Sequence, residues 1–369
     1  MEPYPNVAEL SDGEFLQAFT RKLTAVGIPF SASIELTERC NLRCVHCFLG
    51  DQRLAHRRRE QELSTAEWTD ILDQIAALGT LRLLITGGDP LLRPDFAEVY
   101  SHAKRLGLVV TVFTNGTLVT PEIVELFRAL PPYAVEISLY GATAETYEAI
   151  TRVPGSFRRC LDGIERLREL GVDLGLKTVV MKGNQHEIAG IAELARSLGT
   201  LRFRFDTEIQ GAFGGDRRPL TVRLEPEEAV RAELSCPETA AAWRDFFRRR
   251  EGLVAAPSER LYACSAGESF VSVDPYGRLQ PCLAVHHMSH DLRGSTLVAG
   301  LAAVRRQLAD RQVPLAFECS TCEDRIFCSA CPAFALQEHG AEERPAAFQC
   351  HVTKIRRRFL GSEPVAKER

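Results

Sequence analysis

Cys40-Asn41-Leu42-Arg43-Cys44-Val45-His46-Cys47 places three cysteines within one short stretch, with the spacing C-x3-C-x2-C. This spacing lets three thiolates of a single loop converge on one metal centre. A structural zinc ion or an iron–sulfur cluster normally takes four protein ligands, so three thiolates leave one position open. Open positions are where metal centres carry out chemistry. A zinc site completed by a distant fourth ligand is the alternative that the spacing leaves open.

The residues around this loop predict an α/β fold. Alternating apolar and polar residues at 33–37 predict a strand that runs into the cysteine loop. Strands alternating with helices predict parallel βαβ units, and therefore a barrel or an open sheet whose reactive groups lie on loops after the strands. The other five predicted strands lie at 81–85, 109–113, 134–139, 174–180 and 202–205.

Composition excludes several classes of function. The chain has 369 residues, which is enough for two domains, and its net charge of −4 gives no electrostatic case for nucleic-acid binding. We find no apolar run near the roughly 18–20 residues that cross a bilayer, and no export signal at the start, so we expect a cytoplasmic protein without membrane attachment. Twelve cysteines in such a protein indicate metal or redox chemistry rather than disulfides.

The cysteine loop resembles the signature of the radical S-adenosylmethionine (radical SAM) superfamily, C-x3-C-x-Φ-C, with His46 at the aromatic position. The resemblance implies a partial (β/α)6 barrel and a [4Fe–4S] cluster on Cys40, Cys44 and Cys47. It also implies that SAM binds the fourth iron through its amino and carboxylate groups. An external electron donor of the flavodoxin or ferredoxin type would supply the electron that cleaves SAM. The resulting 5′-deoxyadenosyl radical would abstract a hydrogen atom from the substrate.

Motifs after the later strands match positions that contact SAM in this family. The turn with Gly87, Gly88 and Asp89 follows the second strand, where the family has a GGEP-type motif; the acid here is one methylene shorter. A tight βα turn and an Asn-Gly turn are the alternative readings of the motifs at 86–90 and 114–117. The resemblance assigns further contacts with SAM to Asn115, Ser138, Arg152 and Lys177.

A second set of cysteines fills the end of the chain. Cys264, Gly277 and Cys282 have the spacing C-x12-G-x4-C, and a C-x2-C-x5-C-x2-C run follows at 319–331, with a last cysteine at 350. This pattern resembles the SPASM extension of radical SAM enzymes, with the run one residue shorter at its end. Zinc knuckles are the alternative.

The resemblance implies two auxiliary [4Fe–4S] clusters. Auxiliary cluster I takes Cys264, Cys282 and Cys331, and auxiliary cluster II takes Cys319, Cys322, Cys328 and Cys350. Two full clusters need eight thiolates and this half supplies seven, so we expect one open iron on the first cluster. The alternative is that Cys236, His286 or His287 completes it. We expect Cys160 to pack in the core, and Cys236 is also a weak candidate for a catalytic role.

These patterns predict four segments: a lead-in at 1–30, the radical SAM barrel at 31–215, a helical link at 216–260 and the SPASM domain at 261–369. We expect a solvated basic loop at 51–62. We expect no leader-peptide-binding domain before Ser31, so that a separate protein or the barrel mouth would recognise a leader.

The resemblance implies an enzyme that modifies a ribosomally made peptide or protein by crosslinking, epimerisation or oxidation. One alternative is a radical SAM enzyme of a cofactor or small-molecule pathway, such as a haem-related one. Another is a non-catalytic iron–sulfur protein for electron transfer or assembly. The glycine motif at 86–90 matches a SAM-binding position of the family. It argues against the non-catalytic iron–sulfur protein, because an electron carrier needs no SAM site.

Overall fold

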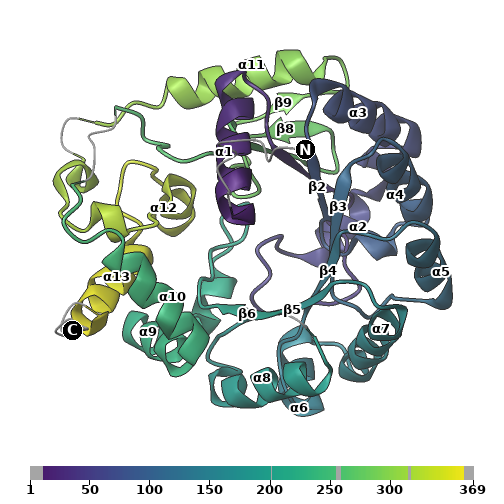
Figure 1. Cartoon of the computed structure of the whole chain (residues 1–369), viewed down its shortest axis with the longest axis horizontal. Helices are drawn as coiled ribbons and strands as arrows, with labels where there is room; N and C mark the ends of the chain where they lie inside the picture. Colours follow the sequence, from purple (N-terminus) through teal and green to yellow (C-terminus); the bar gives the residue numbers. More distant parts are fainter. Residues whose placement is uncertain (1–10, 201, 255–258, 315–316, 361–369) are drawn as a thin grey trace, which may run out of the picture.

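The computed structural model describes residues 11–200, 202–254, 259–314 and 317–360. Within these ranges, six parallel strands pair in chain order and curve into an open arc (Figure 1). This arrangement confirms the predicted α/β fold with a partial barrel. The strands are β1 (Ser31–Glu35), β2 (Arg82–Thr86), β3 (Val109–Thr114), β4 (Ala134–Ser138), β5 (Leu174–Val179) and β6 (Arg202–Asp206).

Helices cover the outer face of the arc, and the last segment of the chain gathers beside its opening (Figure 1). Apolar strand residues such as Ile34, Val112 and Ile137 are fully buried in the core under the outer helices. Polar residues alternate with them and face the lumen, so each strand carries its apolar side outward. The helices are α1 (Asp12–Ala25), α2 (Gln52–Arg57), α3 (Thr65–Leu78), α4 (Phe96–Arg105), α5 (Pro121–Ala129), α6 (Ala144–Thr151), α7 (Ser156–Leu170), α8 (Ile188–Ser197), α9 (Pro226–Ser235), α10 (Pro237–Arg248), α11 (Leu297–Ala309), α12 (Pro332–His339) and α13 (Ala347–Leu360).

The sheet continues past β1 into the cysteine-rich segment. β7 (Phe270–Val273) pairs with β1 in parallel, and β8 (Arg278–Gln280) and β9 (His290–Asp291) follow in antiparallel order. β7 and β8 form a hairpin between Cys264 and Cys282. The segment assigned to the C-terminal domain therefore adds strands to the barrel sheet. The division of the chain into domains stays a prediction.

The stretch 51–62 is mostly exposed, as expected, but it is helical and not a loop. The Asp51 carboxylate accepts a hydrogen bond from the Arg53 backbone N–H at 2.9 Å and starts α2, as an N-cap does. Gln52, at the start of α2, is only 8% exposed. The Glu62 carboxylate is buried as well, and receives two hydrogen bonds from the Arg39 guanidinium. Among the described residues, no helix is both long and apolar enough to cross a bilayer.

Candidate active site and metal centres

The cysteine loop follows β1 and is fixed against the end of α6. The backbone N–H groups of Arg43 and Val45 donate to the carbonyls of Thr151 and Ile150 at 2.9 and 3.0 Å. Burial, then the nearby Asp89 and Cys47, raises the pKa of Cys40 to about 12. Burial, then the proximity of Cys40 and Cys47, also raises the pKa of Cys44. The three thiols therefore form one half-buried group. Three converging thiols suit a cluster with one iron left for another ligand.

The close packing of the turn after β2 against residues 37–39 explains the two glycines of this turn. The N–H of Gly88 donates to the Thr37 carbonyl at 2.7 Å, and the next N–H donates to the Arg39 carbonyl at 2.9 Å. A Cβ on Gly88 would lie 2.3 Å from that Arg39 oxygen, and one on Gly87 would lie 2.2 Å from the Thr37 oxygen. Both positions therefore need glycine so that this turn can contact the segment leading into Cys40. Their predicted contact with SAM stays a prediction.

Asp89 joins two loops. Its buried carboxylate accepts hydrogen bonds from the Leu91 N–H at 3.0 Å, and from the Thr114 hydroxyl and the Asn115 N–H at 2.8 Å each. Burial raises the pKa of this carboxyl to about 6, although these hydrogen bonds oppose the rise. The shorter acid thus holds the turn after β2 against the loop after β3. Its contact with the SAM amino group remains a prediction.

Asn115 connects the loop after β3 with the cysteines. Its Nδ2 donates to Asn41 Oδ1 at 2.8 Å and approaches Cys40 Sγ at 3.5 Å. Its Oδ1 accepts hydrogen bonds from the N–H and the hydroxyl of Thr117, and that hydroxyl also accepts from Asn41. This closed network of hydrogen bonds holds the Asn115 side chain against Cys40, the first cysteine of the loop.

We expect Asn115→Asp to weaken the cluster on the cysteine loop. The variant keeps the acceptor and the size of the side chain, but replaces the donor that faces Cys40 with a negative charge. Loss of an outer partner of a metal ligand typically costs ~10–100-fold in metal affinity. Iron retention during dilution against a chelator would measure the loss. Unchanged iron retention would show that the contact between Asn115 and the Cys40 sulfur does not stabilise the bound cluster.

Three other predicted SAM contacts lie on the cysteine loop and on β4 and β5. His46 is half-buried, burial lowers its pKa to about 4, and its Nδ1 has no hydrogen-bond partner. Its ring meets the Tyr140 ring edge-on at 4.7 Å. Lys177 pairs in register with Ser138, and its ammonium lies 3.2 Å from the centroid of the Phe113 ring. Burial lowers the pKa of Lys177 to about 7.

Arg152 lies on the surface at the end of α6. Its φ of 58° is the only left-handed value at a non-glycine residue in the described part of the chain. This conformation ends α6 directly beside the Thr151 carbonyl that holds the cysteine loop. The strained backbone therefore has a structural reason. A contact of the guanidinium with the SAM carboxylate stays a prediction.

Two sets of later cysteines lie near one another: Cys282 with Cys264 and Cys331, and Cys319 with Cys322, Cys328 and Cys350. Burial, then the nearby Cys331 and Cys264, raises the pKa of Cys282 to about 11. Burial also raises the pKa of Cys319 to about 11, followed by the effects of Cys328, Cys322 and Cys350. Nowhere in the described ranges do three His, Cys, Asp or Glu side chains surround a single ion position. Which metal each group binds stays a prediction.

The three residues suggested as a fourth ligand of the first group each make a hydrogen bond within the chain, and the two histidines do so through Nε2. The Cys236 thiol donates to the Glu238 carboxylate at 3.1 Å. The His287 ring is hydrogen-bonded to the buried Glu342, which also accepts from a tyrosine hydroxyl. His286 makes a hydrogen bond with the Leu283 carbonyl at 3.0 Å. Of the predicted leftover cysteines, Cys160 is fully buried in the core, as expected.

Three aromatic rings connect the two cysteine regions. Phe48, next to Cys47, meets Phe213 at a centroid distance of 5.4 Å, and Phe213 stacks on His286 at 3.6 Å. The Phe213 N–H also donates to the Phe48 carbonyl at 2.8 Å. The loop after β6 thus links the cysteine loop to the segment after Cys282.

Sequence reasoning missed the residues that support the cysteine loop from outside. Gln52 Oε1 accepts the Cys40 N–H at 2.6 Å, and its amide donates to the Glu38 carbonyl at 3.2 Å. The Thr37 hydroxyl donates to Glu62 and accepts the Arg39 N–H at 3.0 Å. The only sequence signal was their position near the loop, because an isolated glutamine in a basic stretch has no distinctive spacing.

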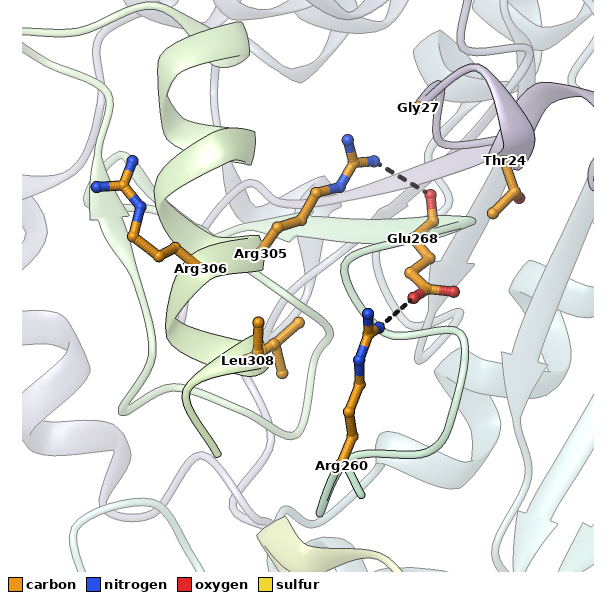
Figure 2. Close-up of a pocket in the computed structure, with 8 residues that line it drawn as sticks. Thr24, Gly27, Arg260, Glu268, Arg305, Arg306 and Leu308 are labelled. Atoms are coloured by element: carbon orange, nitrogen blue, oxygen red, sulfur yellow. Dashed lines mark hydrogen bonds and ion pairs between the residues drawn. The ribbon is translucent and has the colours of Figure 1, made fainter. Parts of the chain in front are cut away.

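A cavity of ≈570 Å³ lies between α1 and α11, at the amino end of β1 (Figure 2). The cysteine loop lies at the carboxyl end of the same strand, so this cavity is not the candidate active site. Its arginines are engaged: Arg260 pairs with Glu268 at 3.0 Å, and Arg305 donates to the Gly267 carbonyl at 2.8 Å.

Comparison with known proteins agrees with this site. The model of the Radical SAM superfamily matches residues 34–195. An AdoMet-dependent heme synthase of Methanosarcina barkeri is 30% identical over 84% of this chain and 94% of its own length. The PqqA peptide cyclase of Gluconobacter oxydans is 32% identical over 71% of this chain and 72% of its own.

The fold agrees as well. Streptococcus suis SuiB bound to the precursor peptide SuiA superimposes with a TM-score of 0.64 and 16% identity, over 93% of this chain and 82% of SuiB. A barrel that begins at a C-x3-C-x2-C loop, together with relatives of this identity and coverage, makes the chain an enzyme rather than an electron carrier. The chain belongs to the radical SAM superfamily.

Proposed function

We propose that this radical SAM enzyme modifies a ribosomally made peptide or protein. The observation that carries the proposal is the presence of two further cysteine groups, linked to the cysteine loop by the rings of Phe48, Phe213 and His286. Related proteins support the substrate class: PqqA peptide cyclase is named for a peptide, and SuiB has been solved with its precursor peptide.

Cys40, Cys44 and Cys47 would hold the cluster that SAM completes. The bound cluster and SAM supply the radical that abstracts hydrogen, while the protein supplies orientation and shielding. In this chain, Asn115 and Gln52 fix Cys40 from two sides. His46, Ser138, Arg152 and Lys177 would contact SAM.

The auxiliary groups would hold two more [4Fe–4S] clusters. The Cys236 thiol donates to Glu238, which supports an iron on the group of Cys264, Cys282 and Cys331 that Cys236 does not ligate. A substrate thiolate bound at that iron would be activated and held in place. An external reductant of the flavodoxin or ferredoxin type, a separate leader-binding protein and a cytoplasmic location complete the proposal.

A haem-related activity is the second candidate. The heme synthase relative matches 94% of its own length, more than the peptide cyclase relative does. The test is SAM cleavage by anaerobically reconstituted enzyme under reductant, with either a peptide encoded by a neighbouring short reading frame or an iron porphyrin precursor. A mass change in the peptide that requires SAM would support the first candidate. A mass change in the porphyrin alone would replace it with the second.

A further inference from the structure

Helix α2 lies with one face against the cysteine loop. The buried residues of this face are Gln52 and Ala55. Gln52 Oε1 accepts the Cys40 N–H at 2.6 Å, and His56 Nε2 lies 3.4 Å from the Cys40 carbonyl oxygen. An α-helix with its side chains is about 10–12 Å thick, so a molecule seated on the opposite face of α2 is roughly that far from Cys40.

The opposite face of α2 is open to solvent. Because the helix has about 3.6 residues per turn, Arg53, Leu54 and Arg57 lie together on the side away from the buried face, and all three are exposed. The Leu54 side chain is apolar, yet this residue is 55% exposed. Arg59 follows directly after the helix and is exposed as well. We call these four residues the α2 surface.

The α2 surface presents guanidinium groups to solvent rather than carboxylates. Arg53 pairs with Asp51 at 2.8 Å, but the Arg53 side chain is 84% exposed and that of Asp51 only 27%. Arg218, on the loop after β6, lies close to both residues and is also more exposed than the aspartate with which it pairs. Exposed ion pairs contribute little to stability, so Arg53 can exchange Asp51 for the carboxylate of a partner at little cost.

Two arginines of the α2 surface have no ionic partner. Neither Arg57 nor Arg59 forms an ion pair with any residue in the described ranges. Glu60 is exposed next to Arg59 and offsets one of the two charges. The α2 surface therefore carries an excess of positive charge around one exposed leucine. Such a surface fits a partner with an apolar spot inside an acidic surface.

We propose that the α2 surface is the docking site of an acidic flavodoxin, the external one-electron donor. The inference rests on the external reductant of the proposed function and not on its substrate. An electron can cross the thickness of a helix through protein, whereas a hydrogen atom cannot be abstracted across it. This face therefore suits a partner that delivers an electron better than it suits the substrate. The apolar dimethylbenzene edge of a flavin suits contact with Leu54, which favours a flavodoxin over an iron–sulfur carrier.

Binding of oxidised bacterial flavodoxin to the holoenzyme tests the inference without SAM or substrate. Titration calorimetry at low ionic strength gives the Kd. We expect the triple variant Arg53→Gln, Arg57→Gln and Arg59→Gln to bind about tenfold more weakly or worse, because opposite charges across an interface steer and hold the partner. At ~1 M salt, where the Debye length is about 3 Å, this difference should disappear.

A second variant, Leu54→Ala, tests the apolar part of the α2 surface. Salt does not screen an apolar contact, so we expect a several-fold loss of affinity that persists at high salt. The matched control changes three exposed arginines of other helices, Arg21, Arg105 and Arg306, to glutamine. It removes the same charge as the triple variant and should bind flavodoxin as the native enzyme does.

SAM cleavage gives an independent readout of docking. With reduced flavodoxin as the donor, the triple variant should cleave SAM more slowly than the native enzyme. With dithionite, a small ion that needs no docking surface, the two enzymes should cleave SAM equally fast.

Equal Kd values for the native enzyme and the triple variant, or an equal loss of affinity in the control, would overturn the inference and leave the proposed function standing. Weaker binding of the peptide substrate, with unchanged binding of flavodoxin, would also overturn it. A peptide that stays unmodified with dithionite as reductant would overturn the proposed function and leave the docking site standing.

Discussion

Changing Cys40, Cys44 and Cys47 together to alanine should abolish formation of 5′-deoxyadenosine. These thiols form one half-buried group after β1, whereas the other two groups lie in the later segment. If each of the three groups holds a [4Fe–4S] cluster, the native enzyme carries about 12 Fe and the variant about 8. Iron analysis and chromatography of the SAM cleavage products measure both effects.

The later cysteines are the internal control for this variant. Their iron should stay, because the paired thiols that bind it are untouched. Deoxyadenosine formed by the triple variant would contradict the assignment of the cysteine loop. Tightly bound zinc with little iron in the native protein would instead contradict the assignment of the later groups.

Gly88→Ala should remove the same cluster without touching a ligand. The new Cβ would meet the carbonyl oxygens of Arg39 and Glu38 at 2.3 and 2.4 Å, and these atoms belong to the backbone. The segment that leads into Cys40 must therefore shift, and the hydrogen bond from the Asp89 N–H to the Arg39 carbonyl must lengthen. Overpacking of this kind typically costs ~1–3 kcal/mol. We expect loss of about 4 Fe and of SAM cleavage.

Gly294→Ala is the matched control. A Cβ at Gly294 meets no atom within 4 Å, so this variant should keep its iron and its activity. Circular dichroism would confirm that both variants fold. A Gly88→Ala enzyme with full iron would show that the contact between the turn after β2 and the cysteine loop is not needed to hold the cluster.

The strands and the cysteine groups could be predicted from the sequence because each has a local signature. Period-two alternation marked β1, and C-x2-C spacing marked the later cysteine groups. The support around the loop had no such signature. Gln52 contacts Cys40 only because Asp51 starts a helix there, and the buried pair of Glu62 with Arg39 forms only in the folded chain.

Contacts between segments that are far apart in the sequence could not be predicted from local patterns either. The sequence did not predict that β7 pairs with β1. The stacking of Phe213 on His286 likewise joins segments with no shared periodicity. Such contacts depend on how the loops cross the barrel, and neither the composition of the chain nor the spacing of its motifs indicates that path.

The pairing of β1 with β7 also bears on the order of events during synthesis. Ser33 and Ser272 are 239 positions apart. At ~5–20 residues per second, one edge of β1 waits about 12 s or longer for its partner strand to leave the ribosome. An uncovered strand edge is a template for pairing with other chains. The segment that contains β7 therefore also pairs with the open edge of β1. We expect chains that stop before residue 270 to aggregate.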